Sequence, residues 1–182
     1  MRTNFFGPLY ATQAVLPGMR ARHSGTIINV SSVGGQDGNP TCGLYAASKF
    51  ALEGLSEALS KEVAEFGISV LIVEPGQFRT NFLNAFVLNE GGLSEAYRGT
   101  VVDQALQKFH SAAGKQIGDP EKAVNVIFEV VTGEGGAGSL KGKILRLPLG
   151  EDALKRIKAK TDRVNSDLDA IWKIATATTF DE

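Results

Sequence analysis

The sequence contains the run Gly25-Thr26-Ile27-Ile28-Asn29-Val30-Ser31-Ser32, which is apolar and β-branched and predicts a buried strand. A loop rich in Gly, Asp, Asn and Pro follows at residues 34–40. The clearest helical pattern of the chain comes next, over residues 44–66. Its polar positions, Glu53, Glu57, Lys61 and Glu62, are expected to face solvent. The chain therefore passes from strand to loop to helix, with Ser32 at the end of the strand.

The same alternation continues on both sides of this run. Two further strands are expected at residues 68–73 and 143–148, and helices at residues 8–22, 101–110, 120–131 and 151–177, the last with a candidate break near Asn165. Phe82, Leu83, Phe86 and Val87 suggest one more short helix. Strands that alternate with helices predict a parallel sheet with right-handed crossovers. We expect an α/β fold of three αβα layers, a partial doubly wound sheet with only three strands.

Composition excludes several classes of protein. Of 182 residues, 43% are hydrophobic and 21% charged, as in ordinary globular proteins, and a net charge of −1 gives no attraction to nucleic acid or anionic membrane. Cys42 is the only cysteine, so no intrachain disulfide can form, and His23 and His110 have no partners at metal-ligand spacing. No segment approaches the roughly 18 apolar residues that span a bilayer, and no signal-peptide core is present. A cytoplasmic protein without a metal site is expected.

The most reactive pattern is Tyr45-Ala46-Ala47-Ser48-Lys49. Its spacing places the Tyr45 phenol and the Lys49 ammonium on one helix face, one turn apart. A free phenol has a pKa of about 10, and a fixed cation nearby favours the phenolate and lowers that pKa. Such a pair could protonate a carbonyl or deprotonate an alcohol. The alternative is a tyrosine at a helix start beside a solvated lysine.

Other polar residues fall at strand ends, where ligands bind in open α/β sheets. Ser32 could donate a hydrogen bond to a substrate oxygen or cap a turn, and Ser31 competes with it for the first role. Pro75-Gly76 could bring backbone close to a ligand, with the Thr80 hydroxyl beside it, or form a simple turn. For Asn4, local sequence favours a helix cap over a residue that holds water.

Taken together, these motifs resemble the classical short-chain dehydrogenase/reductase family. The matching segments are Asn4-Phe5-Phe6-Gly7, Gly25-Thr26-Ile27-Ile28-Asn29-Val30-Ser31-Ser32, Tyr45-Ala46-Ala47-Ser48-Lys49 and Pro75-Gly76-Gln77-Phe78-Arg79-Thr80. The resemblance implies that residues 1–150 are the C-terminal part of a Rossmann-like, NAD(P)-binding domain and that residues 151–182 are a helical extension. Residues 80–114 would then form a mobile substrate lid.

The resemblance implies reversible hydride transfer between NAD or NADP and an alcohol/ketone or aldehyde pair. Tyr45 would be the general acid/base, and Lys49 would lower its pKa and bind the nicotinamide ribose. Ser32 would orient the substrate oxygen, and Asn4 would hold a water that links Lys49 to solvent. The remaining cofactor contacts implied are Tyr45 itself, Pro75, Gly76 and Thr80.

The family's glycine-rich strand–turn–helix, which seats the pyrophosphate, has no counterpart in this sequence, because Met1 falls at the helix that carries Asn4. Cofactor binding and activity by these 182 residues alone are therefore expected to be negligible. Three hypotheses are open: a fragment or mispredicted gene start of an oxidoreductase, a truncated inactive relative that dimerises through the helices near Asn4 and Tyr45, or a degenerate product without a role. Intact Ser32, Tyr45 and Lys49 favour the first, whereas the absent nucleotide site favours the second or third for this polypeptide. An unpaired apolar edge is expected on strand 26–30.

Overall fold

The structure, a computed structural model, describes residues 1–85 and 90–180. Within them, three parallel strands form one sheet in the order β1 (Gly25–Val30), β2 (Ile68–Pro75) and β3 (Arg146–Leu149). The predicted α/β class with a partial parallel sheet is confirmed. Of the predicted helix around Phe82 and Leu83, residues 83–85 form one 3₁₀ turn, and Phe86 and Val87 lie outside the described residues.

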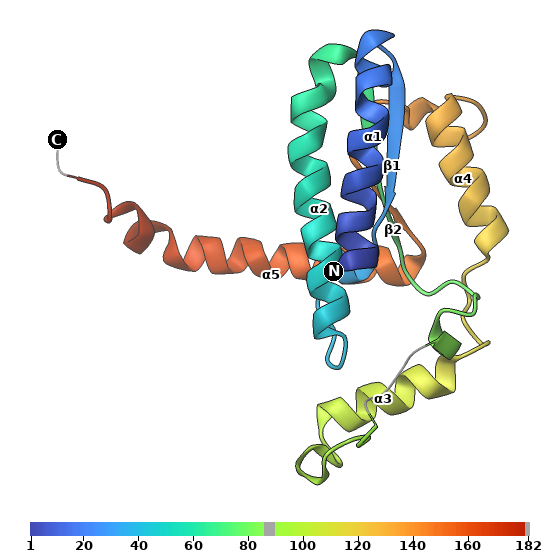
Figure 1. Cartoon of the computed structure of the whole chain (residues 1–182). Helices are drawn as coiled ribbons and strands as arrows, with labels where there is room; N and C mark the ends of the chain where they lie inside the picture. Colours follow the sequence, from blue (N-terminus) through green and yellow to red (C-terminus); the bar gives the residue numbers. More distant parts are fainter. Residues whose placement is uncertain (86–89, 181–182) are drawn as a thin grey trace.

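Helices cover both faces of the sheet, as Figure 1 shows. Helices α1 (Gly7–Ala21) and α2 (Gly43–Val63) lie on one face, and α4 (Pro120–Thr132) lies on the other. Helix α3 (Val101–Ala112) stands apart from this body, and α5 (Glu151–Thr176) extends away from it. The three layers place the ends of β1 and β2 beside the start of α2, where the candidate site residues lie.

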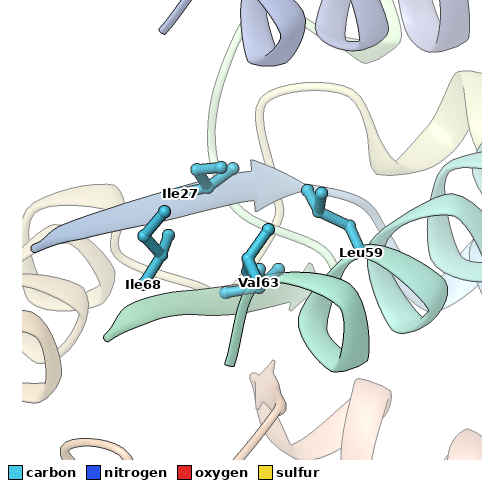
Figure 2. Packing of buried hydrophobic residues seen from close by; sticks show 5 residues of the cluster. Ile27, Leu59, Val63 and Ile68 are labelled. Atoms are coloured by element: carbon cyan, nitrogen blue, oxygen red, sulfur yellow. The ribbon is translucent and has the colours of Figure 1, made fainter. Parts of the chain in front are cut away.

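The core has one cluster of apolar side chains on each face of β2, because successive residues of a strand point to opposite faces. Toward α1 and α2, Ile68 and Val70 pack with three further buried residues. Figure 2 shows this cluster, with Ile27, Leu59, Val63 and Ile68 labelled. Toward α4, Leu71 and Val73 pack with Val130, Leu147 and Leu149. This two-sided burial matches the continuous apolar run of β2.

Local sequence signals set the start of α4 and the end of the helical segment after α2. Asp119 accepts hydrogen bonds from the backbone N–H groups of Glu121 and Lys122 and caps α4, with Pro120 in its first turn. After α2 a short 3₁₀ turn ends at Gly67, whose φ of 65° is left-handed. These two positions confirm the predicted start of α4 and the predicted stop at Gly67, although the helix expected to run to residue 66 ends as α2 at Val63 and continues as the 3₁₀ turn.

Three details differ from the sequence-based expectations. Helix α5 is continuous, so the candidate break near Asn165 is wrong; Asn165 is exposed, and its amide can be solvated without disturbing the helix. The third strand begins at Arg146 instead of residue 143. Glu53, which was expected to face solvent, is only 4% exposed, because Arg146 and Gln36 bond its carboxylate.

The outer edge of β1 is open within the described part of the chain, since β1 pairs only with β2. Ile28 and Val30 are 39% and 55% exposed there, in agreement with the expected apolar edge. No described helix combines the length and apolarity needed to cross a bilayer.

Candidate active site

A cavity of about 800 Å³ lies at the carboxyl ends of β1 and β2. It gathers the end of β1, the first turns of α2 and the segment after β2, which is the usual ligand position in an open parallel sheet. Of the seven residues singled out from the sequence, six line it: Ser32, Tyr45, Lys49, Pro75, Gly76 and Thr80. The seventh, Asn4, lies outside it.

Ser32 joins the loop after β1 to α2. Its Oγ accepts the Gly34 backbone N–H at 3.0 Å and caps the short 3₁₀ turn, and its side chain is also hydrogen-bonded to Tyr45. The competing Ser31 is buried, and its Oγ has no hydrogen-bond partner among the described residues. Ser32 is therefore the serine that contacts the phenol.

Burial dominates the acidity of the Tyr45 phenol. It raises the pKa of Tyr45 above the usual value of 10.0, the hydrogen bond from Ser32 opposes this, and nearby Cys42 adds a smaller rise. The Phe82 ring lies 5.5 Å from the Tyr45 ring, centroid to centroid, and covers part of it. Tyr45 is thus a neutral phenol at pH 7.

Lys49 lies close to Tyr45 without contacting its oxygen. The Lys49 Nζ donates to the Val30 carbonyl at 2.9 Å and stands 5.9 Å from the centroid of the Tyr45 ring. Burial lowers the pKa of Lys49, and the charge of Glu53 partly restores it. The lowering of the Tyr45 pKa that the sequence led us to expect from Lys49 is absent from this arrangement, because burial dominates and the Lys49 ammonium is bonded to the Val30 carbonyl instead of the phenol oxygen.

Asn4 is linked to the backbone of Tyr45 through hydrogen bonds to Ser48 of α2. It lies in a π-helical turn, Arg2–Phe6, and its Nδ2 donates to Ser48 Oγ at 3.1 Å. Ser48 Oγ in turn donates to the Tyr45 carbonyl at 2.7 Å. Asn4 and Lys49 both line a second hollow of about 420 Å³ between α1 and β1, so Lys49 borders both spaces.

The turn after β2 is fixed by the start of α5. The Gly76 N–H donates to the Leu149 carbonyl at 2.8 Å, and the next N–H, of Gln77, donates to the Asp152 carboxylate at 2.9 Å. A Cβ at Gly76 would collide with that carboxylate. Thr80 is exposed, and its Oγ1 accepts the Phe82 N–H at 3.3 Å. The turn is both a tight structural connection and a wall of the cavity.

Sequence reasoning missed a buried group of charges behind the site. Arg146 Nε donates to Glu53 at 3.1 Å and lies 3.5 Å from Glu74, while Gln36 Nε2 donates to both carboxylates at 3.2 and 3.0 Å. Burial and the neighbouring charge of Glu53 raise the pKa of Glu74 to about 7. The spacing of Glu53, four residues beyond Lys49, was the signal that could have placed it on the same face.

Two further lining residues, Gln116 and Arg156, were not singled out from sequence. Gln116 comes from the segment between β2 and α4, and Arg156 comes from α5. Arg156 also holds the loop after β1, because its guanidinium donates to Asp37 at 2.8 Å and to Asn39 at 3.1 Å. Among the described residues, no cluster of His, Cys, Asp or Glu could hold a metal ion.

Comparison with known proteins finds close relatives. Oxidoreductase claN of Passalora fulva is 53% identical over 64% of this chain and 52% of its own length, and oxidoreductase BOA17 of Botryotinia fuckeliana is 35% identical over 95% and 60%. A solved short-chain dehydrogenase from Streptomyces avermitilis superposes with a TM-score of 0.78 at 38% identity, over 96% of this chain and 60% of that one. The chain thus spans little more than half the length of these proteins.

More distant structures share the fold. A short chain dehydrogenase from Burkholderia cenocepacia in complex with NADP has a TM-score of 0.57 at 18% identity, and one from Burkholderia phymatum in complex with NAD has 0.68 at 19%. The family model described as short chain dehydrogenase matches residues 1–91, half of the chain, and that span includes every residue of the candidate site named from sequence. The chain therefore belongs to the short-chain dehydrogenase family.

Proposed function

We propose that this protein is an NAD(P)-dependent oxidoreductase that interconverts an alcohol and a ketone or aldehyde, with Tyr45 as the acid/base. The observation that carries the proposal is the meeting of Tyr45, Ser32 and Lys49 in one cavity at the carboxyl ends of the strands. The Tyr45 hydroxyl is hydrogen-bonded to Ser32 and faces a space large enough for a small substrate. Relatives that span most of this chain are named oxidoreductases.

The raised pKa of Tyr45 bears on the direction of the proton transfer. A phenol that keeps its proton at neutral pH can give it to a carbonyl oxygen while the carbonyl carbon takes up a hydride. Ser32 holds that oxygen through a hydrogen bond. In the reverse direction the phenolate of Tyr45 accepts the alcohol proton, so alcohol oxidation requires higher pH than carbonyl reduction.

Lys49, Pro75, Gly76 and Thr80 are the residues we propose for the nicotinamide end of NAD or NADP. All four line the cavity, and Gly76 has no side chain that could occupy it. The cofactor supplies the hydride when it is bound. Asn4 contributes from outside the cavity by fixing the turn of α2 that carries Tyr45, through Ser48. We place this reaction in the cytoplasm.

The test is an assay of the protein expressed from the complete open reading frame that contains this sequence. NADH and NADPH consumption is followed with a panel of ketones and aldehydes. Tyr45→Phe should lower kcat at least about a hundredfold, because it removes the transferable proton. The matched control is Tyr97→Phe, an exposed tyrosine outside the cavity, which should leave kcat unchanged. A Tyr45→Phe enzyme that keeps its rate refutes the acid/base role.

A second candidate function is an interaction module, without catalysis, that dimerises through α1 and α2. It is favoured by the exposed apolar side chains of these helices, among them Tyr10, Leu44 and Phe50. If this function is correct, no cofactor is consumed with any substrate, and Leu44→Lys abolishes dimerisation. Turnover that depends on Tyr45 favours the oxidoreductase.

A further inference from the structure

The loop that leads into α2 contains a strained residue. Thr41 has a φ of 71°, in the left-handed region that a β-branched residue rarely adopts. It stands just before α2, in which Gly43 is the first residue and Tyr45 the third. A strained conformation of this kind costs free energy and persists only where the surrounding structure holds it. Contacts that fix this loop therefore act directly in front of Tyr45.

Local sequence leaves the start of α2 without a side-chain cap. Within the described chain, the side chain of Cys42, the residue before the helix, bonds none of the first N–H groups of α2. The Cys42 N–H donates to the Asn39 carbonyl at 3.2 Å, and the Cys42 carbonyl accepts the Ala46 N–H at 2.7 Å. The position of the first turn, which carries Tyr45, thus depends on the backbone of residues 39–42.

Arg156 of α5 anchors this loop through three hydrogen bonds. Its Nε donates to the Asp37 carboxylate at 2.8 Å, and its Nη2 donates to the Asp37 carbonyl at 3.0 Å and to Asn39 Oδ1 at 3.1 Å. The guanidinium is planar and presents several donors in a fixed arrangement, so it can hold a backbone carbonyl and two side chains at once. The loop is therefore tied to a helix that lies far along the chain.

The beginning of α5 is itself fixed, so Arg156 acts from a rigid base. Ala153 is fully buried, and the Asp152 carboxylate accepts the Gln77 N–H at 2.9 Å. The side chains of Arg156 and Asp37 are only 28% and 31% exposed. Salt therefore screens this ion pair less than a pair on the open surface.

The same anchor reaches the serine of the candidate site. The Asp37 N–H donates to the Val33 carbonyl at 3.0 Å, in the 3₁₀ turn that Ser32 caps. Ser32 and Tyr45 are the two side chains that are hydrogen-bonded to each other in the cavity. Arg156 thus holds the middle of the segment that connects them.

We propose that Arg156 is a positioning residue, which holds residues 37–41 in their strained conformation and so keeps the Tyr45 phenol within reach of Ser32. Without Arg156, Thr41 relaxes to negative φ, and the first turn of α2 shifts with it. Proton transfer requires hydrogen-bond geometry, so the shift lowers kcat while the substrate still fits the cavity. The proposal rests on the acid/base role proposed above for Tyr45, whereas the anchoring of the loop can be measured without it.

Kinetics of the protein expressed from the complete open reading frame test the positioning. Arg156→Gln should lower kcat at least about tenfold, with a smaller change in KM. Adding Thr41→Gly to this variant should restore kcat to within about threefold of the wild type, because glycine adopts positive φ without strain. Thr41 is not among the described residues that line the cavity, so such a rescue cannot come from a substrate contact. A wild-type kcat in Arg156→Gln, or no rescue by Thr41→Gly, overturns the proposal.

Two further variants control for charge and for folding. Arg163→Gln makes the same change on the exposed outer part of α5 and should leave kcat unchanged. Arg156→Lys keeps the charge but lacks the planar fork that reaches Asp37 and Asn39 together, so its kcat should fall between the wild type and Arg156→Gln. Circular dichroism checks that all variants melt as folded proteins. An equal loss of kcat in Arg163→Gln and Arg156→Gln contradicts the positioning role.

Hydrogen exchange followed by mass spectrometry tests the anchoring without turnover. In Arg156→Gln the amides of residues 39–46 should exchange at least about tenfold faster than in the wild type, while those of β2 should be unchanged. Unchanged exchange at residues 39–46 overturns the proposal whether or not the protein is active. Faster exchange there, in a protein that turns over no substrate with either cofactor, supports the anchoring and refutes the acid/base role of Tyr45 instead.

Discussion

Individual residues in this structure serve two purposes at once. Ser32 was weighed from sequence as a turn cap or as a group that orients substrate, and its one hydroxyl both accepts the Gly34 N–H and bonds Tyr45. Thr80 likewise caps the turn before Phe82 while it lines the cavity. A structural role for such a residue is therefore no argument against a functional one.

Glu74 gives the stability of this fold a pH dependence. Its pKa is raised from 4.5 to about 7, so between these values the folded state holds a proton that the unfolded state has released. The stabilisation is complete below pH 4.5 and is lost as the pH rises through 7, by on the order of 3 kcal/mol. In Glu74→Gln this loss should disappear, which chemical denaturation followed by circular dichroism at pH 5 and pH 8 will measure.

The exposed Glu62 provides the control for that measurement. Glu62→Gln should retain the decrease in unfolding free energy between pH 5 and pH 8. An unchanged decrease in Glu74→Gln would show that another group holds the proton.

The sequence was sufficient to predict residues that line the cavity, but it did not predict the buried charged group beside them. Tyr45, Lys49 and Ser32 could be named because motif spacing and the end of a strand place them together. Glu53 was wrongly assigned to solvent, because its partners Arg146 and Gln36 are distant in sequence and only the assembled sheet brings them close. The direction in which the Tyr45 pKa shifts was predicted wrongly for the same reason, because the burial of Tyr45 depends on the whole fold.

At the scale of elements, two turns at the amino end of the sheet lie in close contact. Gly67 ends the turn after α2 with a φ of 65°, and a Cβ built there lies 2.7 Å from the His23 carbonyl oxygen, in the turn between α1 and β1. The start of β2 is thus positioned by both turns. Helix starts and ends were well predicted because they depend on such local signals, as at Asp119 and Gly67.

Substitution of Gly67 by alanine should therefore cost about 2 to 3 kcal/mol of unfolding free energy, from the left-handed backbone and the close backbone contact. Thermal or chemical denaturation measures it. Gly38→Ala is the matched control, since its Cβ meets nothing within 4 Å, and a change below about 0.5 kcal/mol is expected. Equal stability of the two variants would show that the turn relaxes without cost.

At the scale of the whole molecule, the sheet is asymmetric. β2 is covered on both faces and paired on both sides, whereas β1 leaves Ile28 and Val30 exposed beside an open edge in the described structure. Unpaired edges with apolar side chains favour association with other chains. The sequence predicted this edge from the number of strands, but it could not show how far α5 extends, because the length of a helix does not fix where it packs.

Aggregation of the 182-residue chain should respond to the β1 edge. Ile28→Lys adds a charge to this exposed position and should lower light scattering at high concentration without lowering the melting temperature. Ser94→Lys adds the same charge on an exposed turn away from the sheet and should leave scattering unchanged. Equal scattering by the wild type and Ile28→Lys would place the association elsewhere.

The position of Trp172 has a practical consequence for spectroscopy. It is the only tryptophan of the chain, and it lies on the outer part of α5, far along the helix from the buried Ala153. The fluorescence of Trp172 therefore reports on the surroundings of α5 and changes little when the sheet unfolds. An unfolding curve recorded by tryptophan fluorescence would follow a different event from one recorded by circular dichroism, and disagreement between the two would be a property of where the indole lies, with no folding intermediate required.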